Sequence, residues 1–168
     1  IRNRDVDGED AIRRYLYGTV EDLYDPLLMK DMGKAADLVE EAVRNGVKIA
    51  ICSDFDVDGI FSGMILLEGI LRIGGEASVY TPDRVKEGYG LNDRIVEEAH
   101  SEGYGMILTC DNGIAAAEPI LRAKELGMTV VVTDHHEVPY TLEESGERRC
   151  PLPAAEGLVE HKQEDCPY

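Results

Sequence analysis

The sequence has no apolar run near the roughly 18 residues that are needed to cross a bilayer. Its first residues, IRNRDVDG, also lack the apolar segment of a signal peptide. Both absences argue against a membrane protein and against a secreted one. With 168 residues, of which 43% are hydrophobic, the chain is long enough to bury a core as a soluble globular domain.

Cysteine is scarce. The four cysteines, Cys52, Cys110, Cys150 and Cys166, include no CxxC pair, and their density is too low for a disulfide scaffold. We therefore expect a reducing, cytoplasmic environment. Cys52 and Cys110 are expected to be small buried residues and not ligands of a soft metal.

Basic residues are few as well, since 17 Lys and Arg face 34 Asp and Glu and leave a formal net charge of −17. Such a charge repels phosphate backbones over about a Debye length, roughly 8 Å at physiological salt. A nucleic-acid substrate would have to be attracted locally by metal ions and a few cations, or by parts of a longer protein. The start at Ile1 and the end at Tyr168 lead us to expect such a longer protein.

Apolar runs and helical periodicity alternate along the chain. The pattern predicts helices at 26–45, 60–73, 91–102 and 114–126, and strands at 47–52, 77–81, 106–109 and 129–133. Strands and helices that alternate in this way form βαβ units. We therefore predict an α/β fold of three layers, with a mostly parallel sheet and helices on both faces.

The chain divides into three regions. Residues 1–25 form a polar leader, whose Tyr and Leu side chains, from Tyr15 to Tyr24, we expect to dock on the domain. Residues 26–140 hold the strands and helices of the domain itself. Residues 141–168 are rich in Pro and Glu, which indicates an irregular acidic tail or the start of a connection to a further domain.

Groups that can bind metal follow three of the four predicted strands. They are Asp54, Asp56 and Asp58 after the first strand, Asp111 after the third, and Asp134, His135 and His136 after the fourth. The carboxyl ends of parallel strands share one edge of a sheet, where open α/β sheets bind their ligands, so these groups should converge. Clustered carboxylates repel one another unless a cation neutralises them. Hard oxygen ligands favour Mg²⁺, Mn²⁺ or Ca²⁺, and carboxylates with imidazoles suit a site for two divalent ions, which activate a water and hold a phosphoryl group.

Four segments carry a family resemblance: SDFDVDGIFS at 53–62, PDRVKEGYGLN at 82–92, TCDNGI at 109–114 and VTDHHE at 132–137. They resemble the successive motifs of the DHH phosphoesterase superfamily. Within it, the GYGLN loop and the leader DLYDPLLMKDM at 22–32 resemble the RecJ single-strand-specific exonucleases. Ser53 stands where glycine is frequent and Asn112 where cysteine is frequent, but neither is a ligand position.

The resemblance implies a site for two Mn²⁺ or Mg²⁺ ions. Asp56 and Asp58 would take one ion each, Asp111 would bridge both and take part in catalysis, and His135 would bind the second ion. Asp54 and Asp134 would act as auxiliary ligands or support the others. The catalytic residue His136 would contact the scissile phosphate, and Arg84 and Ser62 would contact substrate phosphate.

The implied activity is metal-dependent hydrolysis of nucleic acid, by a 5′–3′ exonuclease on single-stranded DNA that serves repair and recombination. Short oligoribonucleotides or cyclic dinucleotides are alternative substrates, and a non-catalytic DHH-like scaffold is the alternative class. Family members also have a further metal-binding aspartate after the His pair and a second domain that grips the substrate. Neither can be located in this sequence, so we expect the chain alone to be a poor enzyme.

Two unrelated interpretations of the Asp-rich segment are weaker. An EF-hand calcium loop that begins at Asp54 would need Glu at position twelve, where Ile65 stands. A phosphatase of the haloacid dehalogenase type would use the segment from Asp56 to Gly59 as its nucleophile motif. The His pair is not expected in such a phosphatase, and its late pair of aspartates is missing.

Overall fold

The computed structural model describes residues 4–143 and 148–168, and its centre is a five-stranded sheet. The strand order is β2-β1-β3-β4-β7, and every neighbouring pair is parallel. The strands are β1 (Lys48–Ser53), β2 (Ala77–Tyr80), β3 (Tyr104–Cys110), β4 (Thr129–Asp134) and β7 (Gly157–Glu160). This arrangement confirms the predicted parallel sheet.

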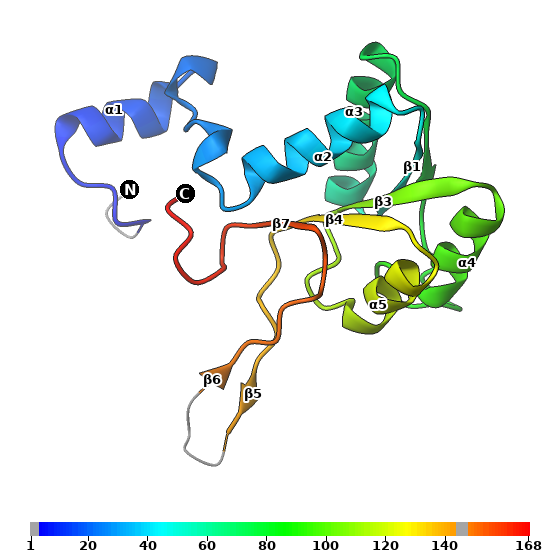
Figure 1. Cartoon of the computed structure of the whole chain (residues 1–168). Coiled ribbons are helices and arrows are strands. Elements are labelled where there is room, and N and C mark those ends of the chain that lie inside the picture. Colours follow the sequence, from blue (N-terminus) through cyan, green and yellow to red (C-terminus); the bar gives the residue numbers. More distant parts are fainter. Residues whose placement is uncertain (1–3, 144–147) are drawn as a thin grey trace.

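Helices cover both faces of the sheet, as predicted (Figure 1). On one face lie α2 (Met32–Arg44) and α3 (Val57–Arg72), and on the other lie α4 (Asp93–Ser101) and α5 (Ala117–Glu125). Successive side chains of a strand point to opposite faces. In β4, Val131 therefore belongs to the core between the sheet and helices α2 and α3, whereas Val130 and Val132 belong to the core between the sheet and helices α4 and α5.

Two observed helices start at residues other than the predicted ones. The predicted helix at 26–45 is a 3-10 turn, η3 (Pro26–Leu28), followed by α2, because Asp31 has a left-handed backbone with φ 62°. Helix α3 starts at Val57, since the Asp56 carboxylate accepts a hydrogen bond from the Gly59 amide at 3.0 Å. The start of α3 thus lies within the Asp-rich segment.

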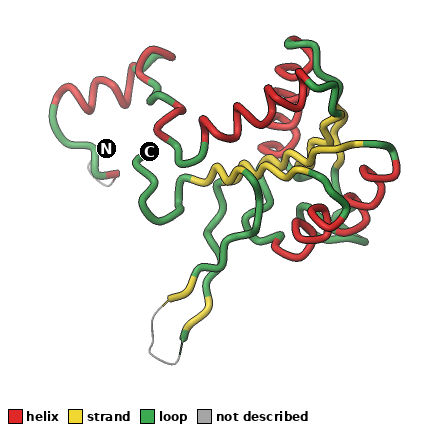
Figure 2. Tube along the Cα trace, viewed as in Figure 1, coloured by secondary structure: helices red, strands yellow, loops and turns green. Residues whose placement is uncertain are grey.

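The structure corrects the expectation of an irregular acidic tail at 157–160. These residues form β7, which pairs with β4 in the register Val132 to Leu158, and Leu158 and Val159 are buried. A strand of four residues between Pro- and Glu-rich segments is too short to show a period in the sequence. Nearby, β5 (Thr141–Leu142) and β6 (Arg148–Arg149) form a small antiparallel pair that projects from the body (Figure 2).

The leader does not enter the core. It contains α1 (Glu9–Tyr17) and the 3-10 turn η2 (Val20–Asp22), and no residue of α1 is buried. The expected anchors between Tyr15 and Tyr24 are all at least half exposed. Two 3-10 turns separate α1 from α2, so α1 lies beyond the edge of the sheet (Figure 1). The leader meets the chain end instead, where the rings of Tyr24 and Tyr168 lie 6.0 Å apart.

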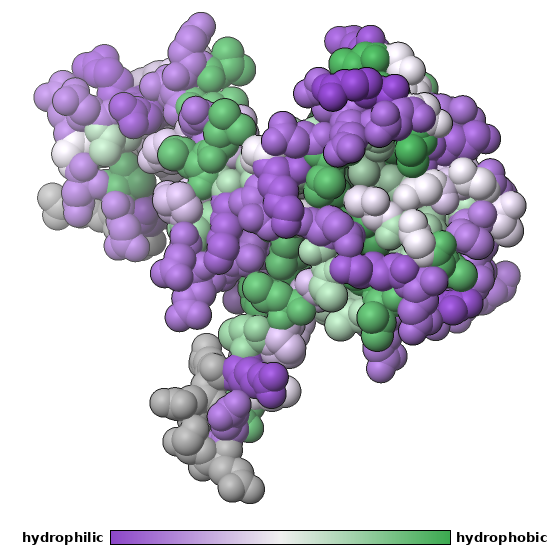
Figure 3. Space-filling model, in the orientation of Figure 1, coloured by the Kyte–Doolittle hydropathy of each residue, from purple (hydrophilic) through white to green (hydrophobic). Residues whose placement is uncertain are grey.

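The surface agrees with the acidic composition, because hydrophilic side chains cover most of the face seen in Figure 3. None of the helices in the described ranges combines the length and the apolar character that crossing a bilayer requires.

One carboxylate is buried at the end of β7. Glu160 is fully buried and lies opposite Asp134 in the strand register. Its Oε1 accepts a hydrogen bond from the Lys162 amide at 2.8 Å, but its Oε2 has no hydrogen-bond partner among the described residues. Burial raises the pKa of Glu160, the Lys162 amide opposes this, and the charge of Asp134 adds to it.

We expect Glu160→Gln to raise the free energy of unfolding at pH 8 by about 1 kcal/mol. A raised folded pKa means that wild-type stability falls as pH rises from about 4.5 through the folded pKa. The advantage of the glutamine variant should therefore be full at pH 8 and vanish below pH 4.5. Urea unfolding of both proteins across this range measures it.

Glu156→Gln is the matched control, because Glu156 pairs with Lys124 at 2.8 Å. Burial acts to raise the pKa of Glu156, but hydrogen bonds from Lys124 and the Val130 amide outweigh it and lower the pKa. This variant should lose stability at pH 8. Equal losses in the two variants would contradict the effect assigned to the buried charge of Glu160.

Candidate metal centre

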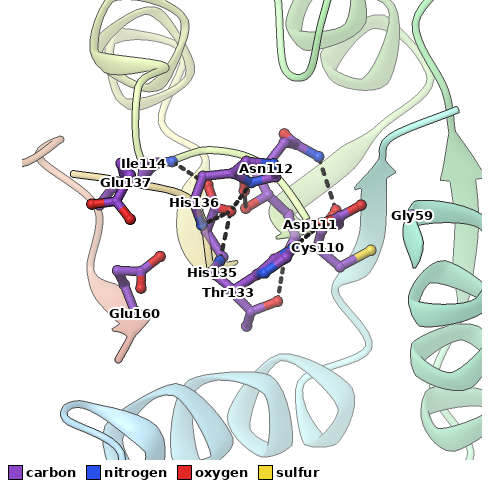
Figure 4. Close-up of polar contacts among 12 residues, drawn as sticks. Gly59, Cys110, Asp111, Asn112, Ile114, Thr133, His135, His136, Glu137 and Glu160 are labelled. Carbon is purple, nitrogen blue, oxygen red and sulfur yellow. Dashed lines mark hydrogen bonds and ion pairs between the residues drawn. The ribbon is translucent and has the colours of Figure 1, made fainter. Parts of the chain in front are cut away.

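The ends of β1, β3 and β4 bring two groups of possible metal ligands together. One group is Asp54, Asp56 and Asp111, and the other is Asp111, His135 and His136. Within each group the ligand atoms all lie within 4.8 Å of one another. Figure 4 shows Asp111, His135 and His136 gathered between the ends of β3 and β4. Asp111 belongs to both groups, so the two groups form one cluster.

The first part of the cluster depends on a close contact between β1 and α3. A Cβ atom on Gly59 would lie 2.5 Å from the Asp54 carbonyl oxygen, so only glycine lets α3 begin so near this loop. Asp54 is 3% exposed, and its Oδ1 has no hydrogen-bond partner among the described residues. The Gly59 amide also lowers the pKa of Asp56, which favours its ionised form.

Asp111 lies at the centre of the cluster. Its Oδ1 is 2.6 Å from His135 Nε2, and its backbone is left-handed with φ 62°. Burial raises the pKa of Asp111, the hydrogen bond with His135 opposes this, and the charge of Asp56 adds to it. A cation between these carboxylates would relieve their repulsion.

Asp134 organises the two histidines. Its Oδ1 accepts hydrogen bonds from the His135 amide at 2.7 Å, the His136 amide at 3.1 Å and His136 Nδ1 at 2.7 Å. Its Oδ2 accepts one from the Ile114 amide at 2.9 Å. Both oxygens are therefore engaged in holding the segment that carries the His pair.

The same carboxylate sets the state of His136. Burial lowers the pKa of His136, but the hydrogen bond to Asp134 and the charge of Asp134 outweigh burial and leave the pKa raised. Donation by Nδ1 to Asp134 leaves Nε2 as the nitrogen that can meet another group. When it is protonated, His136 can donate a hydrogen bond from Nε2 to an anion.

Three further predicted residues lie near the cluster but outside both groups. Asp58 and Ser62 line a pocket of about 370 Å³ together with Asp111 and His135. Ser62 Oγ donates a hydrogen bond to the Gly59 carbonyl at 3.1 Å. The Arg84 guanidinium lies 4.7 Å from the ring centroid of Phe55, which places a cation beside the Asp-rich loop. Their contacts with metal or phosphate stay predictions.

Sequence reasoning missed the structural role of Asn112. This residue is fully buried and donates to the Cys52 carbonyl at 3.0 Å and to the Cys110 carbonyl at 2.9 Å. Its Oδ1 accepts a hydrogen bond from the Leu91 amide at 3.1 Å. Asn112 therefore ties the ends of β1 and β3 to the loop at 82–92. An Asp-Asn-Gly segment in a sequence indicates only a turn.

Comparison with known proteins agrees with this geometry. A family model described as the DHH family, N-terminal domain, matches residues 48–166. The single-stranded-DNA-specific exonuclease RecJ of Bacillus subtilis is 37% identical over 98% of this chain, which covers 20% of that protein. The RecJ of Escherichia coli is 35% identical over 80% of this chain, which covers 22% of it. The chain thus spans about a fifth of the length of these relatives.

Two solved structures share the fold. An exonuclease RecJ bound to manganese superimposes with a TM-score of 0.69 and 33% identity, over 82% of this chain and 33% of that one. RecJ from Thermus thermophilus in complex with Mn²⁺ gives a TM-score of 0.66 and 26% identity, over 94% of this chain and 22% of that one. Since the family model covers most of the sequence and the fold agrees, the chain belongs to the DHH family.

Proposed function

We propose that the protein is a phosphoester hydrolase that uses two divalent ions to cleave phosphodiester bonds in single-stranded DNA. The observation that carries this proposal is the place of Asp111 in both ligand groups. A carboxylate shared by two groups is in a position to bind both members of a pair of neighbouring ions.

The donor set fits Mn²⁺ or Mg²⁺. The cluster offers carboxylate oxygens and imidazole nitrogens, which suit these ions, and it contains no thiolate. The buried Oδ1 of Asp54, which has no hydrogen-bond partner in the described part of the chain, is the kind of atom that a cation would satisfy. The two similar solved structures are RecJ proteins bound to manganese, which supports the choice of Mn²⁺.

The residues would divide the work as follows. Asp56 and Asp111 would hold ions together with His135, and Asp58 would serve as a further ligand from the first turn of α3. When bound, the ions would lower the pKa of a water and offset the charge of the phosphate. His136, oriented by Asp134, would donate a hydrogen bond to the scissile phosphate when it is protonated.

The rest of the substrate would meet few cations on this chain. Arg84, stacked on Phe55, would contact a phosphate, and Ser62 at the pocket wall would contact another. Phosphate contacts by Lys and Arg normally supply most non-specific affinity for nucleic acid. With a net charge of −17, this chain would depend on a further substrate-binding domain, and alone it would be a poor enzyme.

The names of the relatives support single-stranded DNA as the substrate and a role in DNA processing. The resemblance supports 5′–3′ polarity, with repair and recombination as the process, and the scarcity of cysteine supports the cytoplasm as the location. A non-catalytic scaffold is the rival function, and we favour the enzyme because Asp54, Asp56, Asp111 and both histidines are retained and gathered.

The test is degradation of DNA and RNA oligomers, labelled at either end, by the full-length protein with Mn²⁺. We expect mononucleotides to be released from the 5′ end of single-stranded DNA, and no release when EDTA is present. If RNA oligomers, or cyclic dinucleotides in parallel reactions, were hydrolysed much faster than single-stranded DNA, they would be assigned as the substrate in its place. No metal-dependent hydrolysis of any of these would overturn the proposal and favour the scaffold.

A further inference from the structure

The loop at 82–92 places one side chain against both halves of the metal centre. The Tyr89 hydroxyl donates a hydrogen bond to the Asp111 carbonyl at 2.5 Å. The same oxygen lies 3.0 Å from His136 Nδ1 and 3.2 Å from Nε2, and the two rings meet edge to face with centroids 5.4 Å apart. Tyr89 therefore contacts the central carboxylate residue and the histidine suited to bind phosphate.

The contact with Asp111 falls at a strained point of the backbone. Asp111 has a left-handed backbone with φ 62°, a conformation that is strained for residues other than glycine, although Asp tolerates it better than most. The hydrogen bond from Tyr89 holds the Asp111 peptide in this conformation. Because that peptide fixes the Cα–Cβ direction, it also fixes how the Asp111 carboxylate meets His135 at 2.6 Å.

The loop that carries Tyr89 is itself held on both sides. On one side, Glu87 accepts a hydrogen bond from the Asp83 amide at 2.7 Å and pairs with Arg94. On the other side, the Leu91 amide donates a hydrogen bond to the buried Asn112. Gly90 has φ 71°, and a Cβ atom on it would lie only 3.1 Å from the Asn112 side chain. The position of the Tyr89 hydroxyl is thus set by the fold.

From these contacts we propose that Tyr89 is a positioning residue of the hydrolytic site. Its hydroxyl sets the direction of the Asp111 carboxylate and of the His136 imidazole, and it acts through them without touching the reacting atoms. The inference rests on the proposed function, since positioning has a meaning only if Asp111 and His136 take part in hydrolysis. This role would also explain how the loop at 82–92 is connected to the possible metal ligands.

Tyr89→Phe in the full-length protein is the direct test, because it removes the hydroxyl and keeps the ring. We expect turnover with Mn²⁺ and single-stranded DNA to fall 10- to 100-fold, the range seen when residues that orient metal ligands are changed. The KM for DNA should change less than about threefold, since the phosphate contacts remain. Tyr80→Phe is the control, because the Tyr80 hydroxyl donates to Glu102 at 2.6 Å and belongs to neither ligand group. It should leave turnover unchanged.

A double-mutant cycle separates positioning from a loss of stability. If Tyr89 acts partly through His136, Tyr89→Phe should cost much less in a His136→Ala background than in the wild type. Full additivity would overturn the part of the role that acts through His136. Wild-type turnover in Tyr89→Phe would overturn the whole role, while wild-type activity still supported the proposed function. An equal fall in Tyr80→Phe would also overturn it. A wild-type protein without metal-dependent hydrolysis would overturn the proposed function, and this role with it.

Discussion

Asp111→Ala should lower metal-dependent hydrolysis by the full-length protein by a factor on the order of a thousand. The reason is that Asp111 belongs to both ligand groups, so its loss would remove an oxygen from each of the two proposed ion sites. No other residue of the cluster is shared in this way. The measurement is the initial rate of mononucleotide release from single-stranded DNA with excess Mn²⁺.

The design of this experiment must separate chemistry from folding. Alanine is strained in the left-handed conformation of residue 111, whereas asparagine tolerates it, so Asp111→Asn keeps the backbone and tests the charge. Asp37→Ala, on the exposed surface of α2, controls for the loss of one negative charge and should keep full activity. A wild-type rate in both Asp111 variants would show that the two-ion assignment is wrong.

The His pair should divide its labour. His135 Nε2 lies 2.6 Å from Asp111 Oδ1, within reach of an ion held by that carboxylate, so His135→Ala should weaken Mn²⁺ binding about 10- to 100-fold. His136 Nδ1 is hydrogen-bonded to Asp134, and Nε2 is the nitrogen that we propose contacts the phosphate. His136→Ala should therefore lower turnover by a similar factor with little change in Mn²⁺ affinity.

Calorimetric titration with Mn²⁺ and steady-state kinetics on the same preparations decide this division. His100→Ala, at the exposed end of α4, is the matched control and should change neither quantity. Equal losses of Mn²⁺ affinity in His135→Ala and His136→Ala would refute the division. They would instead assign both imidazoles to the ions.

Much of the fold could be predicted because most of its strands are apolar and are separated by clear helices. The run at 129–133 is β-branched and buried on both faces, and it forms β4 as expected. In contrast, β7 has four residues, and its place beside β4 depends on pairing across the sheet, which leaves no period in the sequence. The expectation that the apolar side chains of the leader dock on the domain was wrong, because composition does not say where a helix will lie.

The gathering of the site residues followed from topology, since parallel strands end on one edge. Helix α3 starts at Val57, which rules out a calcium loop from Asp54 to Ile65. The match to the DHH family model argues against a phosphatase of the haloacid dehalogenase type. What the sequence could not show is the support around the cluster. Asn112 and Tyr89 make hydrogen bonds between segments that are distant in the sequence, and such contacts have no local signature.

The most direct test of the metal centre is an anomalous difference map from crystals of this chain grown with Mn²⁺, with data collected at the manganese absorption edge. We expect density beside Asp111, bounded by Asp56 on one side and His135 on the other. Asp111→Asn crystals grown in the same way should lose most of it. Manganese density elsewhere on the surface, with none between these three side chains, would contradict the proposal that the strand ends form a metal site.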